Sequence, residues 1–349
     1  MKVNRNKILK DYVKAFIRKN ITGIKAVIFL ELLPHGIAKK INLLGDSGGV
    51  LPLLYNKDGE KMYMIYMADQ NVKYSFIAGR SPKYLLWNHS DKTLSVHFYS
   101  HMSIMEAKKD KKVKVKCLYL HESRAIIPKA YEYVLKHKEI GDLFDYIFTS
   151  DKEILTKYHN AKFWPASGLW YGTDTWGGVL HAERYQMKRK NISILSTYKR
   201  RCKLHQFRYE LAHYYKNKSY VDTYGTFDGG AYIDLCEALD DYRYSIVIEN
   251  EQSPYYFTEK ILNCFAAMTI PIYVGATEID KFFNIDGIIE VKEANIASIE
   301  NAVKCCNEED YQSRINAVID NFLRVQNYLC PEDYIYKHYK KELFIDSNM

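Results

Sequence analysis

Residues 244–275 limit the chain to an alternating α/β fold. The runs 244–248 (YSIVI) and 270–274 (IPIYV) have the length and composition of short buried strands. The segment between them carries apolar residues at the spacing of one helical face: Ile261, Cys264, Phe265 and Met268. Thr258 stands where a helix N-cap is expected. The stretch therefore predicts two parallel strands joined by a helix, and ligands of such sheets bind beyond the carboxyl ends of the strands.

Five polar residues follow the first of these strands: Glu249, Asn250, Tyr256, Glu259 and Lys260. A helix N-terminus presents free N–H groups and partial positive charge, which suit a phosphate, and Lys260 adds a full charge there. Glu259 would repel a phosphate but can accept hydrogen bonds from ribose hydroxyls. The combination favours a nucleotide over a bare anion. A capped surface helix with an adjacent charge pair is the alternative that the spacing alone leaves open.

The same stretch resembles the donor-binding signature of glycosyltransferase family 10, the α1,3/4-fucosyltransferases that use GDP-fucose. The resemblance lies in segments 248–250 (IEN), 256–261 (YFTEKI) and 270–275 (IPIYVG). Ile248 stands where the family has Phe, and Glu251 stands where it has Ser. The resemblance implies donor contacts from Asn250, Tyr256, Glu259 and Lys260.

Two further stretches fit the family. Its members carry a strand, a Ser-containing loop and then an Arg on the next helix that contacts the donor phosphates. Ser196 and Arg208 occupy these positions, and residues 221–225 resemble the Val-Asp-x-x-Gly that follows. An ordinary surface cation is the alternative for Arg208, but its place early in a helix after a strand favours donor binding.

The second stretch is 121–123 (HES) followed by 144–146 (FDY), which resembles Gly-Glu-Asn followed by Phe-Asp-Tyr in the family. The Glu of that segment is the family's proposed general base, so the resemblance assigns this catalytic role to Glu122. His121 and Ser123 depart from the pattern, and His121 ranks second as a base. A carboxylate that only holds residues 123–128 in place is the alternative.

The remaining pattern alternates strands with helices, which predicts parallel sheets. We expect strands over 113–120, 144–149, 192–195 and 287–291, helices over 204–216, 296–306 and 311–325, and two more helices opening at Pro128 and at a capping box over 150–153. With the resemblance, this implies a GT-B architecture, in which two Rossmann-like α/β domains face each other across a cleft. We divide the chain into an acceptor-binding domain (1–180), a nucleotide-sugar-binding domain (181–330) and a C-terminal helical tail (331–349).

The resemblance implies an inverting transferase that moves fucose from GDP-fucose to a hydroxyl of a glycan or lipid-linked glycan, as in cell-surface polysaccharide synthesis. It implies no permanently bound cofactor and no metal at the diphosphate, and the chain has no Asp-x-Asp motif. Two other interpretations stay open. One is a transferase for another nucleotide sugar, because Glu251 replaces the family's Ser. The other is a non-catalytic glycan- or nucleotide-binding module.

The amino-acid composition limits the classes of molecule that the protein is expected to bind. The 50 basic and 42 acidic residues leave a net charge of +8, which suits a diphosphate donor, an acidic glycan or an anionic membrane surface. Without a basic-aromatic motif this charge does not argue for nucleic acid. Seven cysteines without a C-x-x-C motif favour a reduced, cytoplasmic protein. No apolar run approaches the roughly 20 residues of a membrane helix. Animal members of the family that the chain resembles carry an N-terminal membrane anchor, so the resemblance implies the soluble, bacterial type.

Two local patterns carry weaker predictions. Residues 1–25 are basic with a partial apolar stripe, and a helix packed on the domain is favoured over a peripheral contact with the inner face of the membrane. His97-x-x-x-His101 has a spacing that some metal sites use. No third ligand is apparent from the sequence, so we predict a structural role for this pair and no metal site.

Overall fold

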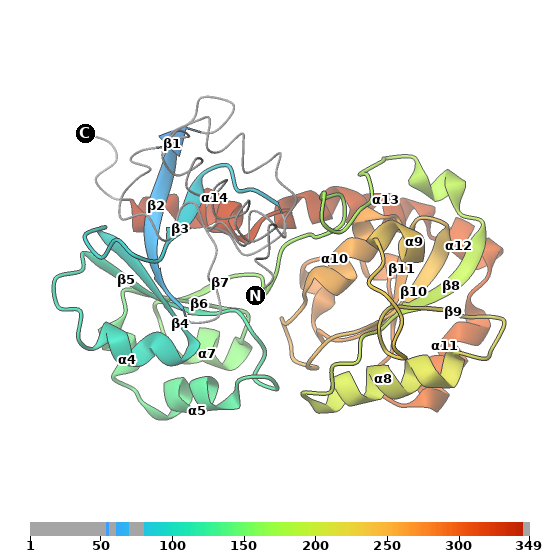
Figure 1. The fold of residues 1–349 in the computed structure, drawn as a ribbon, viewed down its shortest axis with the longest axis horizontal. Coiled ribbons are helices and arrows are strands. Elements are labelled where there is room, and N and C mark those ends of the chain that lie inside the picture. The colour runs from blue at the N-terminus through green and yellow to red at the C-terminus, as the bar shows by residue number, and fades with distance from the viewer. Residues whose placement is uncertain (1–53, 56–60, 70–79, 345–349) are drawn as a thin grey trace, which may run out of the picture.

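The computed structural model describes residues 54–55, 61–69 and 80–344, which form two α/β units lying side by side (Figure 1). The basic stretch 1–25 lies outside the described residues, so the prediction for it is untested. Among the helices that the structure describes, none is both long and apolar enough to cross a membrane.

The first unit is built on a seven-stranded sheet in the order β1-β2-β4-β5-β6-β7, with β3 paired to β2. Its strands are β1 (Leu54–Tyr55), β2 (Lys61–Ala68), β3 (Leu85–Asn88), β4 (Val96–Ser100), β5 (Val115–Leu120), β6 (Tyr146–Thr149) and β7 (Ala161–Phe163). All pairs are parallel except β1 with β2. The strands predicted at 113–120 and 144–149 are confirmed as β5 and β6, each starting two residues later.

Helices cover one face of this sheet: α5 (Pro128–Lys136), α6 (Ile140–Leu143) and α7 (Lys152–Lys157), while the short η1 (His101–Ser103) and α4 (Ile104–Ala107) follow β4. The helices α4, α5 and α7 lie below the sheet in Figure 1. Pro128 opens α5 as predicted. The predicted capping box is wrong in detail, because Asp151 rather than Ser150 caps α7 and accepts from the backbone N–H of Ile154.

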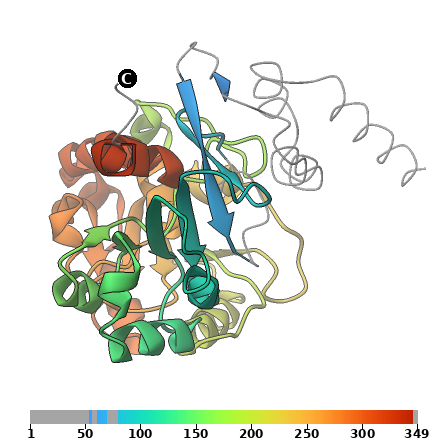
Figure 2. The ribbon, with the colours of Figure 1, turned by 90° about the vertical axis from the view of Figure 1, so that its left-hand side faces the viewer.

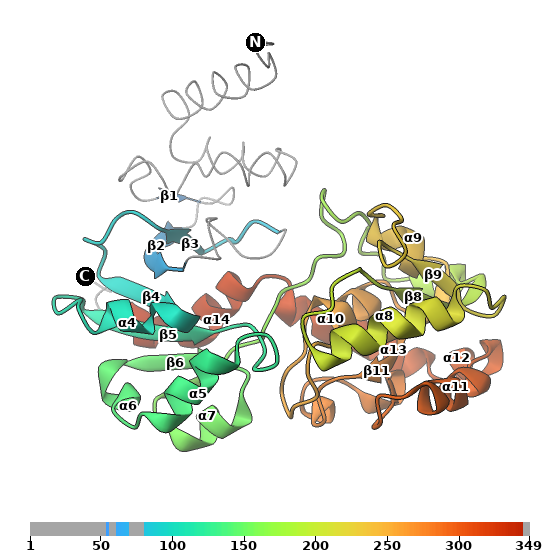
Figure 3. The ribbon, with the colours of Figure 1, turned by 60° about the horizontal axis from the view of Figure 1, so that its bottom comes forward.

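The second unit is built on a five-stranded parallel sheet in the order β12-β11-β10-β8-β9. Its elements are β8 (Lys190–Leu195), α8 (Lys203–Tyr215), β9 (Asp222–Tyr224), α9 (Leu235–Leu239), β10 (Tyr242–Ile248), α10 (Glu259–Ala266), β11 (Ile270–Val274), β12 (Ile289–Glu290), α11 (Ile296–Cys305), α12 (Glu308–Ser313) and α13 (Ile315–Arg324). Figure 3 shows α8 and α11 on the near side of this sheet. The single helix predicted over 311–325 is wrong, because Arg314 separates α12 from α13.

The strand–helix–strand unit predicted at 244–275 is confirmed. The strands β10 and β11 are parallel neighbours, paired in register along the whole of β11. Thr258 caps α10, and its hydroxyl accepts from the backbone N–H of Lys260. Met268 departs from the prediction: α10 ends at Ala266, and Met268 is buried beyond that end with φ at 55°.

The helix α14 (Pro331–Leu343), predicted as part of a C-terminal tail, returns to the first unit (Figures 1 and 2). It packs on the sheet face opposite α5 and α7, in a cluster with Trp87, Phe98 and Phe148. Glu332 on this helix is fully buried and accepts from the indole N–H of Trp87 at 2.8 Å. This helix therefore completes the core of the first unit.

Trp87→Phe is expected to lower the free energy of unfolding by about 1–3 kcal/mol, because it removes a donor from a buried carboxylate. Trp164→Phe is the matched control. The indole N–H of Trp164 is buried and, among the described residues, has no hydrogen-bond partner, so this change loses only packing. Denaturant unfolding measures both. Equal losses in the two variants would show that the Trp87–Glu332 hydrogen bond adds no stability.

Candidate active site

The carboxyl ends of both sheets open into one cavity of about 450 Å³ between the two units. The first unit contributes His121 and Glu122, which directly follow β5. The second unit contributes residues that follow β8, β9 and β10, together with the first turn of α10. Trp170 and Trp176, from the segment that joins the sheets, also line it, and their rings stack 4.6 Å apart. A ligand is expected at this edge of parallel sheets.

Glu249 is the first residue after β10 and ties that strand to α10. Its carboxylate is fully buried and accepts from the backbone N–H of Thr258 at 2.9 Å and from the Thr258 hydroxyl at 2.7 Å. Burial raises the pKa of Glu249, and the ammonium of Lys260, 3.3 Å away, works against that rise. The two adjacent residues therefore have different roles. Glu249 holds the loop between β10 and α10, while Asn250 lines the cavity.

Lys260 is held by three oxygen atoms. Its Nζ lies 3.3 Å from Glu249, 3.2 Å from Glu259 and 2.9 Å from the hydroxyl of Thr258. Burial would lower the pKa of Lys260, but the two carboxylates outweigh burial and raise it. Burial would likewise raise the pKa of Glu259, but Lys260 outweighs it and lowers that pKa. Both Lys260 and Glu259 are therefore charged at neutral pH, and the ammonium is fixed in place.

Arg208 lies on α8 and is buried in the cavity wall, where its guanidinium donates to the carbonyl of Ile248 at 2.7 Å. Burial lowers the pKa of Arg208, and the carboxylates of Glu249 and Glu259 oppose that change. Ser196 follows β8 but does not line the cavity. Its buried hydroxyl instead donates to the backbone carbonyl of Arg208 at 3.4 Å.

Asn250 is oriented by His205. The Nε2 atom of His205 lies 2.6 Å from Oδ1 of Asn250, while Nδ1 of the same ring accepts from the backbone N–H of Arg201 at 3.3 Å. Nε2 therefore carries the ring proton and donates a hydrogen bond to Oδ1 of Asn250. Burial, and then the charge of Arg208, lower the pKa of His205 to about 4, so the ring is neutral at pH 7. With its oxygen fixed in this way, the amide nitrogen of Asn250 faces the first unit.

Three donors converge on Oε1 of Glu122: the backbone N–H of Ser123 at 2.9 Å, the hydroxyl of Tyr256 at 3.2 Å and the amide of Asn250 at 3.4 Å. Two of these donors come from the second unit, so the carboxylate bridges the cavity. Burial, and then Glu122 itself, raise the pKa of Tyr256 well above its usual value, which keeps the phenol a donor. Within the described part of the chain, the hydrogen bonds of this carboxylate all go to Oε1.

His121 also lines the cavity, and its Nε2 lies 3.6 Å from Oδ2 of Asp69. The ring of His101 packs against it, with 4.3 Å between the ring centroids. Burial, and then His121, lower the pKa of His101 to about 2. His97 takes no part in this group: its ring contacts the hydroxyl of Tyr99 and the carbonyl of Leu94, the structural role favoured from the sequence.

Glu251, which departs from the family pattern, points away from the cavity. Its carboxylate accepts from the backbone N–H of Ala125 at 2.9 Å and lines a separate groove between the units. Lys152, which lines this groove, makes a second link between the units through its ion pair with Glu278, at 2.5 Å. Glu251, the residue that left a different donor sugar open in the sequence analysis, therefore does not form part of the cavity wall.

Two glycines let the backbone close around these groups. A Cβ on Gly275 would lie 2.3 Å from the Tyr273 hydroxyl and 2.7 Å from Cγ of Glu249. Gly225 has φ at +99°, and a Cβ there would lie 2.2 Å from the carbonyl oxygen of Ser196. No larger residue fits at these two positions, which explains why glycine occupies them. Both glycines stand at the ends of segments in which the sequence resembles the family.

Six of the seven predicted site residues line the cavity: Glu122, Arg208, Asn250, Tyr256, Glu259 and Lys260. Among the cavity-lining residues to which the sequence analysis gave no role are three with basic side chains, namely His205, Lys199 and Arg201. A signal for His205 was its position one helical turn before Arg208, which places both on one face of α8. Lys199 and Arg201 lie in the loop after β8, at the edge where a ligand was expected.

Residues 186–338 match the sequence model of the C-terminal part of glycosyltransferase family 10 (fucosyltransferase). The curated α-(1,3)-fucosyltransferase FucT of Helicobacter pylori is 37% identical over 57 residues. That match spans 16% of this chain and only 12% of the length of the curated relative.

Among solved structures, Anabaena HepE in complex with UDP and glucose is similar with a TM-score of 0.50 at 7% identity, covering 81% of this chain and 100% of that one. A crystal structure of an α1,3-fucosyltransferase has a TM-score of 0.47 at 14% identity and covers 76% of this chain and 89% of that one. The likeness to HepE concerns the fold alone. It agrees with the predicted GT-B architecture, which the two parallel-sheet units and their shared cavity confirm. Residues 186–338 of this chain are therefore similar to the C-terminal part of glycosyltransferase family 10, the fucosyltransferase family.

Proposed function

We propose that this protein is an inverting glycosyltransferase that transfers fucose from GDP-fucose to a hydroxyl of a glycan or lipid-linked glycan. The observation that carries the proposal is the convergence of two groups in one cavity. The donor-side residues Asn250 and Tyr256 of the family 10 domain contact the carboxylate of Glu122 from the other unit. A transferase needs donor and acceptor to meet in this way, since holding two reactants together removes much of the entropic barrier.

The donor side of the cavity supplies positive charge for a diphosphate. Arg208, Lys199, Arg201 and Lys260 all line it, close to the N-terminus of α10. Negative charge grows on the diphosphate as its bond to the sugar breaks, and cations already held in position stabilise that charge. Lys260 fits this role because Glu249 and Glu259 fix its ammonium in place. We propose that these cations act without a metal at the diphosphate and that Glu259 accepts from ribose hydroxyls.

The acceptor side supplies the base. In the proposed step Oε2 of Glu122 takes the proton of the acceptor hydroxyl while the hydroxyl oxygen attacks the anomeric carbon. The bond from that carbon to the diphosphate breaks, GDP leaves with the electron pair, and the configuration inverts. The three donors on Oε1 hold the carboxylate in one orientation. A base must lie within hydrogen-bond reach of the proton it removes. Glu122 lines the cavity, and the donors on Oε1 leave Oε2 for the acceptor hydroxyl in this proposal.

GDP and GDP-fucose are expected to raise the melting temperature, while UDP-sugars have little effect. A ligand that binds only the folded state at 100 times its Kd stabilises that state by about 2.7 kcal/mol. Differential scanning fluorimetry over a panel of nucleotides and nucleotide sugars measures the shift. Stabilisation by UDP-sugars alone would refute the proposed donor, and stabilisation by none of the panel would refute a nucleotide site.

Lys260→Met is expected to weaken GDP binding by about 1.5–3 kcal/mol, the range for a hydrogen bond to a charged group, and to leave guanosine binding unchanged. Lys203→Met is the matched control, because it removes the same charge from an exposed position at the start of α8. Isothermal titration calorimetry with both ligands measures the effect. Equal weakening of GDP and guanosine would mean that Lys260 only supports the fold.

Glu122→Gln is expected to slow transfer by roughly 10²–10⁴-fold, because it keeps the shape of the side chain and removes its basicity. The affinity for GDP should stay nearly unchanged, and the limb of the pH–rate profile that reports the base should disappear. The assay is GDP release from GDP-fucose in the presence of a panel of oligosaccharide acceptors. Near-normal turnover in this variant, together with an inactive His121→Asn variant, would assign the base to His121.

A further inference from the structure

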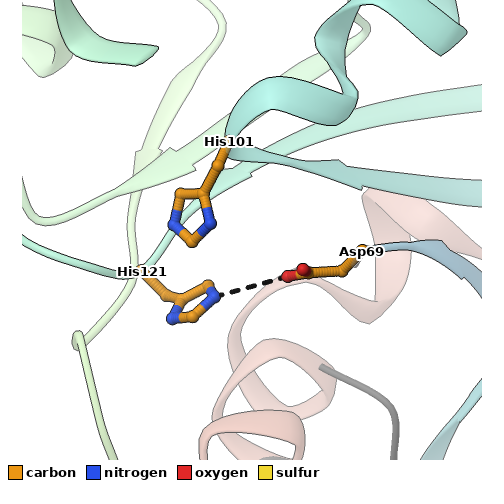
Figure 4. A group of neighbouring side chains, drawn as sticks. All are labelled: Asp69, His101 and His121. Atoms are coloured by element: carbon orange, nitrogen blue, oxygen red, sulfur yellow. Dashed lines mark ion pairs between the residues drawn. The ribbon is translucent and has the colours of Figure 1, made fainter. Parts of the chain in front are cut away.

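Three metal-binding side chains meet at one edge of the first sheet. Asp69, His101 and His121 are the residues that directly follow β2, β4 and β5. These strands are parallel neighbours, so their carboxyl ends meet at the same edge. One candidate ligand atom from each side chain lies within 4.8 Å of the other two. Figure 4 shows the two rings packed together, with the Asp69 carboxylate pointing toward them.

Two ring nitrogens of this group are buried without a hydrogen-bond partner among the described residues. Among the residues that the structure describes, neither Nδ1 of His101 nor Nε2 of His121 makes a hydrogen bond. His101 is only 4% exposed, so bulk solvent does not supply the missing partner. Buried polar atoms are nearly always hydrogen-bonded, and those that are not call for an unseen water or ion. The 3.6 Å between Nε2 of His121 and Oδ2 of Asp69 is too long for a hydrogen bond.

The surroundings hold the three side chains in this arrangement. His101 has φ at 46°, a left-handed conformation that residues other than glycine rarely adopt and that tends to occur at functional sites. The hydroxyl of Ser100 donates to the Asp69 carboxylate, whose side chain is 2% exposed. The ring of Tyr119 stacks on His121 at 4.6 Å. These contacts act on the group in the way that outer-shell residues orient metal ligands.

We propose that Asp69, His101 and His121 bind a divalent transition-metal ion, with Zn²⁺ as the probe. Two imidazoles and one carboxylate are a donor set that such ions accept, and three protein ligands leave a coordination position open. Metal–ligand bonds of about 2.0–2.2 Å place neighbouring ligand atoms about 3.4 Å apart in a tetrahedral site. The 3.6 Å between His121 and Asp69 is close to this value, and a small movement of His101 brings in the third ligand.

Metal binding would be coupled to Glu122. The Nε2 atom of His101 accepts from the backbone N–H of Glu122 at 3.3 Å, so without metal the ring proton resides on Nδ1. A metal ion bound at Nδ1 would shift the ring proton to Nε2. Nε2 could then no longer accept from the backbone N–H of Glu122, so this hydrogen bond would be lost. The ion would join the ends of β2, β4 and β5 and set the position of the segment that carries Glu122. It is bound by the first unit, whereas the proposed diphosphate cations belong to the second, so the proposal does not depend on the donor.

The test is a Zn²⁺ titration of the tag-free full chain after removal of metal by a chelator. A competition indicator reports affinity and stoichiometry, and the visible d–d absorption of bound Co²⁺ reports the nitrogen and oxygen ligands. We expect one ion per chain and a higher melting temperature with Zn²⁺. If the titration showed no binding of one Zn²⁺ ion per chain, the proposal would be overturned, whether or not the protein is an active transferase.

Asp69→Asn and His121→Asn are each expected to weaken Zn²⁺ binding by on the order of 100-fold, because the loss of even an outer-shell partner costs roughly 10–100-fold. His159→Asn is the matched control, since this exposed histidine lies outside the group, and its Zn²⁺ affinity should equal that of the unaltered chain. Far-ultraviolet circular dichroism confirms the fold of each variant. Unchanged affinity in folded Asp69→Asn and His121→Asn would place the metal elsewhere and overturn the proposal.

Discussion

A buried carboxylate organises the cavity. An ionised side chain is costly to bury unless it is paired and hydrogen-bonded. Glu249 meets that condition through both polar groups of Thr258 and through the ammonium of Lys260. Since Thr258 is the N-cap of α10, these contacts fix the start of the helix against the end of β10. Tyr256 and Glu259, on either side of the cap, take their positions from the same constraint.

The two units share polar groups across their interface. Glu122 of the first unit accepts from Asn250 and Tyr256 of the second, and Glu251 of the second accepts from Ala125 of the first. These residues all lie in loops after strands, because that is where parallel sheets expose their backbone ends. A substrate that enters between the units must extend or replace these hydrogen bonds. Its binding is therefore linked to how closely the two units approach each other.

The local sequence pattern correctly predicted those helices and strands that depend only on neighbouring residues in the chain. The strands β10 and β11 and the cap at Thr258 follow from apolar runs and one hydroxyl, and they lie where the sequence placed them. Chain order does not encode which way a side chain turns at a strand end. This is why Ser196 could be placed after β8 but not seen to turn toward α8 and away from the cavity.

The group of Asp69, His101 and His121 could not be predicted for a different reason. Its members are far apart in the chain and meet only because β2, β4 and β5 are neighbours. The strand β3 comes between β2 and β4 in the sequence but pairs with β2 without separating it from β4. The sequence pattern His97-x-x-x-His101 was interpreted as structural, and His97 does lie outside this group. Strand order depends on how whole elements pack, which short-range periodicity does not report.

The position of α14 has a consequence for synthesis on the ribosome. Domains usually fold as units, the first-made before the last. Here one face of the first sheet packs against a helix that follows the entire second unit in the chain. Trp87, Phe98 and Phe148 therefore stay without that cover until the second unit has been made. The emerging chain therefore carries this apolar sheet face without its α14 cover while residues 164–330 are made, and a chaperone that shields apolar surfaces would act during that interval.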